Sequence, residues 1–165
     1  VRQGEPYSLE HRYSEDDGKT WTETERLTTD ADKPDVLHLK IATDDKDNLH
    51  LVWSGYKDTY YRRWSASTKK WESTIGIGNG VTDSLNIVTD KSNLAHVIWQ
   101  GVYDGVWYAK QNTDDTWTRP IQLSKDSYNW GGSNPALAID NTGKLHFVFK
   151  KNNDDANDLY YATYP

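Results

Sequence analysis

The segment from Ser14 to Trp21, SEDDGKTW, places a carboxylate, two hydroxyls and a glycine at regular spacing. Its defined positions are Ser14, Asp16, Gly18, Thr20 and Trp21. Such a string could be a catalytic loop, a calcium-binding loop or a hairpin that recurs along the chain. These alternatives imply different chemistry, and the strands around the segment help to separate them.

Three other segments repeat the pattern Asp-x5-His-x2-aromatic, at Asp44/His50/Trp53, Asp90/His96/Trp99 and Asp140/His146/Phe149. The repeat period is 46 and then 50 residues. Apolar residues alternate on both sides of each polar turn, which is the period of a strand and not of a helix. We therefore expect three hairpins, with left-handed turn residues at Asp47, Asn93 and Gly143.

Two further strands follow each hairpin. The third strand is aromatic-rich, as in TYYRRWS, VWYAKQN and LYYATYP. The fourth opens at Trp21, Trp71 or Trp117 and continues to Leu27, Ile77 or Leu123. A repeat of about 40 to 50 residues with four antiparallel strands is typical of a β-propeller blade. We expect the three tryptophans to be buried between adjacent sheets, and no helix longer than about two turns.

The opening segment falls in the turn between the third and fourth strands, because residues 1–14 align without gaps onto residues 52–65. Its five defined positions resemble the Asp-box of bacterial neuraminidase repeats, and the chain is similar to part of a sialidase-type propeller. The resemblance implies a structural turn remote from the catalytic face. Gly18 permits a positive φ, and Asp16 can bind backbone N–H groups of its own loop.

We therefore expect an all-β chain made of β-propeller blades of four antiparallel strands, about three and a quarter blades, as part of a larger propeller. The ranges are a partial blade over 1–34, blades over 35–80 and 81–132, and an incomplete blade over 133–165. A chain that opens at Val1 and has 0 Met is expected to be a piece of a longer protein. The remainder of the propeller or a second chain is then the expected partner.

Composition argues against several classes of function. The net charge is −6 without a Lys/Arg cluster, which disfavours nucleic acid. No apolar run approaches the roughly 20 residues of a membrane span.

With 0 Cys there is no thiolate site, and the repeated histidines are expected on separate sheets. DDKDN and NNDDAND do not complete a calcium-loop pattern, which leaves only an incidental surface cation open. No metal or cofactor is expected, and alternation aims Arg62 and Arg63 at opposite faces.

Candidate ligand-binding residues lie in loops at the end of the blades opposite the Asp-box. These loops include SGYKD, QGVYDG and KDSYNWGGSNP, and they carry Tyr56, Asp58, Tyr103, Asp104, Asp126, Tyr128 and Trp130. Aromatic rings beside carboxylates and amides suit sugars, whose rings offer an apolar C–H face and several hydroxyls. Tyr128 and Trp130 are the densest group, although Trp130 could instead fill the core between blades.

Two functional classes remain. The first is a carbohydrate-binding or adhesive Asp-box segment of a secreted or surface protein, non-catalytic by itself. The second is part of a sialidase-like glycoside hydrolase or another polysaccharide-active enzyme. The resemblance would then require three arginines, a Tyr/Glu pair and an acid Asp. The family's Phe-Arg-[Ile/Val]-Pro element is absent, and the spacing of the chain's arginines does not recover the triad, so no catalytic residue is assigned.

Overall fold

The computed structural model describes residues 8–28, 36, 38–55, 58–79, 84–101, 105–124, 134–153 and 156–164, with only the backbone for 151–153 and 156–157. The regular secondary structure within these ranges consists of β-strands, and all strand pairs are antiparallel. The prediction of an all-β chain is therefore confirmed for the described residues.

The strands form four sheets. The first sheet pairs β1 (Glu10–His11) with β2 (Glu25–Arg26). The second contains β3 (His38–Thr43), β4 (Leu49–Ser54), β5 (Asp58–Ser65), β6 (Lys70–Trp71) and β7 (Ile75–Asn79). The third contains β8 (Leu85–Thr89), β9 (Ala95–Gly101), β10 (Gly105–Lys110) and β11 (Ile121–Gln122). The fourth contains β12 (Ala136–Ile139), β13 (Leu145–Asn153) and β14 (Ala156–Tyr164).

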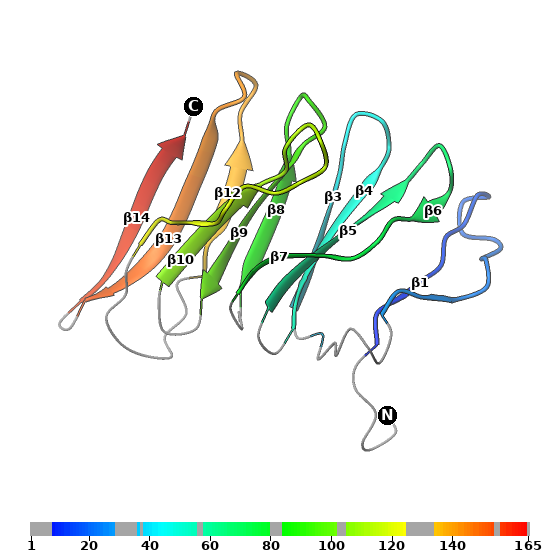
Figure 1. Ribbon diagram of the computed structural model, residues 1–165, viewed down its shortest axis with the longest axis horizontal. Helices are drawn as coiled ribbons and strands as arrows, with labels where there is room; N and C mark the ends of the chain where they lie inside the picture. Colours follow the sequence, from blue (N-terminus) through cyan, green and yellow to red (C-terminus); the bar gives the residue numbers. More distant parts are fainter. Residues whose placement is uncertain are drawn as a thin grey trace, which may run out of the picture.

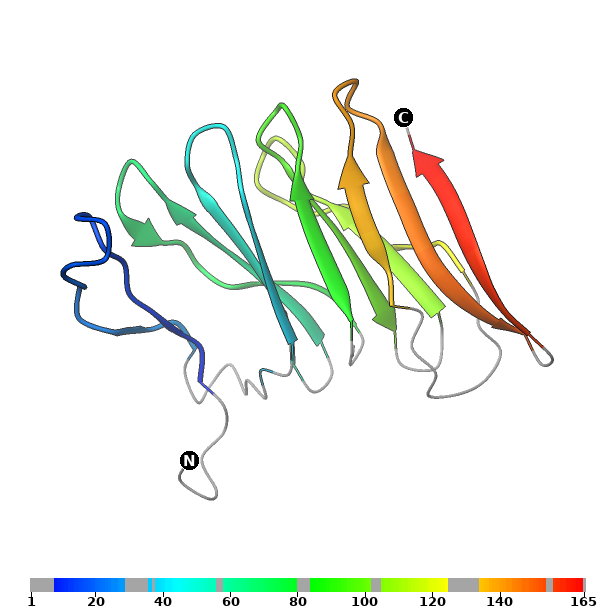
Figure 2. The same cartoon turned by 180° about the vertical axis from the view of Figure 1, so that it is seen from behind.

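The four sheets stand side by side in chain order, as Figures 1 and 2 show from opposite sides. The leading strands of three sheets line up, with β3 beside β8 and β8 beside β12. The first and fourth sheets lie at opposite ends of the row, and the described residues form no closed ring. The division of the chain into propeller blades remains a prediction.

The three predicted hairpin turns are confirmed. In each, the Asp backbone N–H donates to the carbonyl four residues later, and a residue three positions on donates back to the Asp carbonyl. That later residue has a left-handed φ in all three turns: 61° at Asp47, 64° at Asn93 and 88° at Gly143. These turns lie at one end of the row, the upper end in Figure 1.

The core lies between the sheets, in three separate layers. Leu9 and Leu27 of the first sheet meet Leu51 and Trp53 of the second. Tyr61 and Ile77 of the second sheet lie in the next layer, and Tyr108 and Phe147 in the one between the third and fourth sheets. Successive strand residues face opposite sides, so β4 and β9 are buried on both faces. This explains their continuous apolar runs.

The fourth strand of the second sheet is broken into β6 and β7. Trp64 of β5 pairs with Trp71, and Tyr61 of β5 pairs with Ile75. The outer strand therefore carries one more residue between these two pairs than β5 does. A second irregularity lies between Thr59 and Tyr60. The predicted fourth strand is thus an edge with bulges and not one continuous ladder.

The prediction that Trp21 is buried is wrong, because 53% of its surface is exposed. Trp71 and Trp117 are half-buried, and each packs backward against the sheet that precedes its own. Trp71 lies 5.2 Å from the His11 ring, and Trp117 lies 4.8 Å from the Tyr61 ring, between ring centroids. No described sheet precedes the first one, and Trp21 lies instead beside Arg12, whose guanidinium carbon is 5.1 Å from the ring centroid.

Candidate functional site

Of the six residues predicted to bind a ligand, Asp58 alone lies within the described residues. The other five lie outside the described residues: Tyr56, Tyr103, Asp104, Tyr128 and Trp130. Asp126, which the same loops carry, also lies outside them. Asp58 opens β5 and is half-buried. Its carbonyl accepts a 2.8 Å hydrogen bond from the Gly55 N–H, and its carboxylate lies 3.4 Å from the Tyr60 hydroxyl. This places Asp58 at the end of the second sheet opposite the Asp44 turn.

The strand ends that flank the other candidates lie on this same side. β9 ends at Gly101 and β10 begins at Gly105, and Ser124 and Asn134 bracket residues 125–133. Gly105 has a φ of 92°, and a Cβ there would lie 2.1 Å from the Ser124 carbonyl oxygen. Only glycine fits this approach. A shared role for the six residues remains a prediction.

The segment from Ser14 to Trp21, which we call the Asp-box turn after the motif it resembles, closes on itself. The Asp16 Oδ1 accepts hydrogen bonds of 2.8 Å from the Ser14 hydroxyl and from the Thr20 N–H, and Oδ2 accepts one of 2.7 Å from the Thr20 hydroxyl. The Ser14 oxygen also accepts from the Gly18 N–H at 2.8 Å, and Gly18 has a φ of 82°. The Trp21 indole N–H donates to the Gly18 carbonyl at 3.2 Å.

This arrangement favours the hairpin interpretation over a catalytic or calcium-binding loop. Hydrogen bonds from the Thr20 backbone, the Thr20 side chain and the Ser14 side chain lower the Asp16 pKa. Both carboxylate oxygens are thereby occupied within the turn. A carboxylate with its lone pairs directed at its own loop is poorly placed to bind a cation or to attack a substrate.

A second arrangement recurs in three sheets: each repeated histidine bridges the turn Asp and a tyrosine of the third strand. His Nε2 lies 3.1, 3.2 and 3.0 Å from the Asp Oδ2 in the second, third and fourth sheets. His Nδ1 lies 2.8, 2.7 and 2.6 Å from the tyrosine hydroxyl. We call these sets triads; they are Asp44–His50–Tyr61, Asp90–His96–Tyr108 and Asp140–His146–Tyr161.

In the second-sheet triad, hydrogen-bond chemistry assigns the protons. A carboxylate only accepts, so the His50 Nε2 carries a hydrogen, and burial lowers the His50 pKa so that the ring is neutral. The Nδ1 then accepts from the Tyr61 hydroxyl, whose pKa burial raises. Burial would raise the Asp44 pKa, but hydrogen bonds from Asn48 and His50 outweigh it and lower the pKa to about 2.

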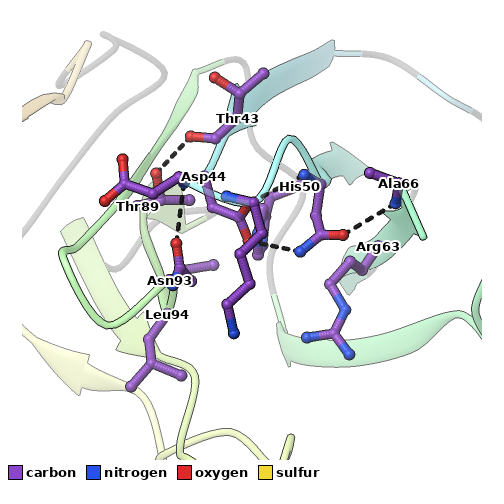
Figure 3. A network of polar contacts seen from close by, with 12 residues as sticks. Thr43, Asp44, His50, Arg63, Ala66, Thr89, Asn93 and Leu94 are labelled. Atoms are coloured by element: carbon purple, nitrogen blue, oxygen red, sulfur yellow. Dashed lines mark hydrogen bonds and ion pairs between the residues drawn. The ribbon is translucent and has the colours of Figure 1, made fainter.

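The residues on either side of Asp44 tie the second sheet to the third, as Figure 3 shows. The N–H of Asp45, next to Asp44, donates to the Asn93 side chain of the third sheet at 2.9 Å. The Thr89 hydroxyl of that sheet donates to the Thr43 carbonyl at 2.6 Å. The side chains of His50 and Asp44 are 0% and 1% exposed, so no substrate reaches them. This triad is a structural network and not an active site.

The sequence analysis named no partner for the repeated histidines and did not predict the tyrosine of each triad. Tyr61, Tyr108 and Tyr161 stand at equivalent positions in the three aromatic-rich strands. Strand register was the signal that could have found them, because the hairpins and third strands of a repeated sheet align. His50, for example, pairs with Arg63, two residues from Tyr61.

Arg62 and Arg63 lie on opposite faces of β5, as alternation predicted. The Arg62 guanidinium donates to the Leu27 carbonyl of the first sheet. Arg63 forms ion pairs with Glu72 at 2.9 Å and with Asp115 of the third sheet at 3.2 Å. Each arginine therefore joins the second sheet to a different neighbour, and the two do not form a common anion site.

Arg63 also borders a polar hollow of about 260 Å³ near the Asp44 turn, together with Lys46, Asn48, Ser65, Ser67 and Glu72. Its charges are largely paired, because Glu72 and Asp115 face Arg63. Across the described part of the chain, no three His, Cys, Asp or Glu side chains gather closely enough to hold a metal ion. The same residues contain no helix long and apolar enough to cross a membrane.

Comparison with known proteins relates the chain to others by fold alone. No protein-family model and no curated protein matches the sequence. The structure is similar to that of the intramolecular trans-sialidase from Ruminococcus gnavus, solved in complex with oseltamivir carboxylate, with a TM-score of 0.53 and 11% identity. The similarity covers 93% of this chain and 37% of the trans-sialidase, so the chain spans well under half of that protein's length.

A second similar structure is the endo-arabinase from Bacteroides thetaiotaomicron, with a TM-score of 0.48 and 16% identity. That similarity covers 77% of this chain and 55% of the endo-arabinase. The similarity to the trans-sialidase establishes a shared arrangement of antiparallel sheets, and at 11% identity no site residue can be transferred from it.

Proposed function

We propose that this chain is a segment of a β-propeller that binds carbohydrate, non-catalytic by itself, within a secreted or cell-surface protein. The observation that carries the proposal is the similarity of 93% of the chain to part of a trans-sialidase, at a TM-score of 0.53. In this proposal each of the four sheets is a blade or part of one. The Asp-box turn is then a folding device shared by such blades.

Two exposed apolar faces, one on β3 of the second sheet and one on β14 of the fourth, support the propeller part of the proposal. Leu39 and Ile41 on β3 are 49% and 55% exposed, whereas the equivalent Leu85 and Ile87 are buried. On β14, Leu159 and Tyr161 are 77% and 63% exposed, whereas the equivalent Val106 and Tyr108 are buried. In a closed propeller, further blades would cover these faces, supplied by the remainder of the propeller or by a second chain.

The proposed carbohydrate contact is the end of the sheets opposite the Asp turns. Tyr56 and Asp58, Tyr103 and Asp104, and Tyr128 and Trp130 belong to segments that join strands at this end. Their chemistry suits a sugar, because aromatic rings stack on the apolar face of a pyranose while carboxylates accept hydrogen bonds from its hydroxyls. Rigid sheets would hold these loops in place.

A sialidase-like or other polysaccharide-active hydrolase is the second candidate, favoured by the trans-sialidase similarity. The known part of the site weighs against catalysis within this segment. Arg62 and Arg63 bind neighbouring sheets in different directions, so they cannot supply two members of one arginine triad. The parent protein could still carry catalytic residues in other blades.

A glycan array combined with a fluorogenic sialoside assay on the full-length protein separates the two candidates. We expect binding to a subset of glycans without turnover of the sialoside. Turnover would instead support the hydrolase, and absence of both binding and turnover would refute both.

Substitution of Trp130 locates the proposed contact. We expect Trp130→Ala to weaken glycan binding at least about tenfold, as loss of an aromatic stacking partner does. Trp21→Ala is the matched control, since Trp21 is an exposed tryptophan at the opposite end of the sheets. Equal binding by the two variants would remove Trp130 from the site.

A further inference from the structure

A hollow of about 240 Å³ lies between the second and third sheets, away from the triads and among residues the sequence analysis did not select as a site. It is lined by Asn79, Trp99, Trp107, Arg119 and Pro120. Asn79 ends β7 of the second sheet, and the other four residues belong to the third. The hollow therefore exists only because the two sheets are stacked.

The aromatic wall of this hollow is held rigidly. Trp99 is fully buried, and its indole N–H donates to the Asn79 carbonyl at 3.3 Å. A Cβ at Gly78 would lie 2.4 Å from the Trp99 ring, so the absence of a side chain lets the indole rest on the β7 backbone. Trp107 pairs directly with Trp99 across β9 and β10, and it is half-buried at the hollow. A preorganised aromatic surface of this kind costs little to present to a ligand.

Arg119 adds a positive charge that the repeated fold does not require. The equivalent positions, two residues after Trp21 and Trp71, hold Glu23 and Ser73. Arg119 is exposed and forms no ion pair with any carboxylate of the described ranges. Its five donors are thus available beside the two indoles. The paired aromatic residues, by contrast, recur at equivalent positions as Trp53 with Tyr60 and Phe149 with Tyr160.

We propose that this hollow binds a carboxylate-bearing pyranose, such as a hexuronic acid residue of an acidic polysaccharide. The Arg119 guanidinium pairs with the sugar carboxylate, because its planar donors match the two carboxylate oxygens. The Trp107 indole packs against the C–H face of the ring, and the Asn79 amide serves a hydroxyl. With a net charge of −6 on the chain, a local cation is needed for an anionic sugar to bind here at all.

The lining of this hollow includes none of the six residues proposed for the loop contact, so its variants test it independently of the proposed function. Isothermal titration of the full-length protein with methyl β-D-glucuronide and with methyl β-D-glucoside compares two probes that differ at the carboxylate. We expect the glucuronide to bind about tenfold more tightly, since a charge-assisted bidentate pair discriminates by roughly this factor. Equal affinity for the two probes would overturn the proposal.

Arg119→Gln should reduce glucuronide affinity to that of the glucoside while leaving the melting temperature unchanged, because Arg119 is exposed. Arg12→Gln is the matched control, since Arg12 lies over the Trp21 ring but borders no part of this hollow. We expect Arg12→Gln to keep the preference for glucuronide. An unchanged preference in Arg119→Gln, or an equal loss in both variants, would overturn the assignment. Trp130→Ala should not affect this preference, which distinguishes the hollow from the loop site.

Discussion

The triads of the second and fourth sheets have the same hydrogen bonds but different surroundings. The distance from His Nε2 to the Asp carboxylate is 3.1 Å in Asp44–His50–Tyr61 and 3.0 Å in Asp140–His146–Tyr161. The distance from His Nδ1 to the Tyr hydroxyl is 2.8 Å in the first triad and 2.6 Å in the second. The His50 side chain is fully buried, whereas that of His146 is 29% exposed. Tyr61 is 1% exposed and Tyr161 is 63% exposed.

The two triads share the same hydrogen-bond geometry, but their contributions to the free energy of unfolding should differ. The triad forms wherever the hairpin and third strand have the right residues, even on a sheet with one open face. Its contribution to stability should depend on the neighbouring sheet, because a buried polar group that loses its partner cannot turn to water instead. Matched substitutions in the two triads test this directly.

The largest difference is expected for removal of the tyrosine ring. Tyr61→Ala should lower the free energy of unfolding by about 3 to 5 kcal/mol, as truncation of a buried aromatic does. Tyr161→Ala should cost less than about 1 kcal/mol, because its ring faces solvent. Urea denaturation of both variants gives the values, and similar costs would show that the neighbouring sheet does not set the energy.

A smaller difference is expected for the carboxylates. Asp44→Asn should cost about 2 to 3 kcal/mol, because it replaces buried charge-assisted hydrogen bonds from Asn48, His50 and the turn backbone. Asp140→Asn should cost clearly less than Asp44→Asn, since water can compensate at this more exposed turn. Asp45→Asn, in the same turn but with an exposed side chain, is the control and should be nearly neutral. The comparison fails if Asp140→Asn proves the more damaging change.

Acid should act through the buried triads. The His50 and His96 pKa values are lowered below 6.5 by burial, so the unfolded chain takes up more protons than the folded chain as pH falls below about 6.5. Stability therefore decreases with falling pH in that range, and further from about 4 toward 2 as Asp44 is protonated.

Denaturation at pH 7.5 and 5.5 should show a loss of roughly 1 to 2 kcal/mol. His146→Gln should preserve this pH dependence, because the effect arises at the buried histidines. A loss of the pH dependence in that variant would place its source in the exposed triad instead.

The smallest effect is expected at the Asp-box tryptophan. Trp21→Ala should cost less than about 1 kcal/mol, because the ring is 53% exposed and packs mainly under Arg12. Trp99→Ala, which removes a fully buried indole, should cost about 3 to 5 kcal/mol. Comparable destabilisation by Trp21→Ala would contradict the exposure of this ring.

Several features could be predicted from sequence because they depend on neighbouring residues. The hairpin turns and the left-handed positions at Asp47, Asn93 and Gly143 involve contacts three to four residues apart. The opposite directions of Arg62 and Arg63 follow from strand alternation. The Asp-box turn likewise uses only residues between Ser14 and Trp21.

Other features could not be predicted in this way. The sequence analysis did not predict the broken edge of the second sheet, which depends on bulges between β5 and the outer strand. Among the predicted ligand-binding residues, Asp58 could be placed beside Tyr60, and the remaining five lie outside the described residues. The hollow at Arg119 required the stacking of β7 on Trp99, which no local pattern indicates.

The sequence alone thus specified the order of the strands, their turns and the Asp and His residues that recur in each hairpin. These features could be predicted because the interacting groups are only a few positions apart in the chain. Burial was decided by the tertiary structure. Equivalent residues such as Tyr61 and Tyr161, or Ile87 and Ile41, have the same local sequence context but opposite exposure. The physical reason is that each sheet face gains its apolar contacts from another sheet about 50 residues away in the chain, and a face without such a neighbour stays in water.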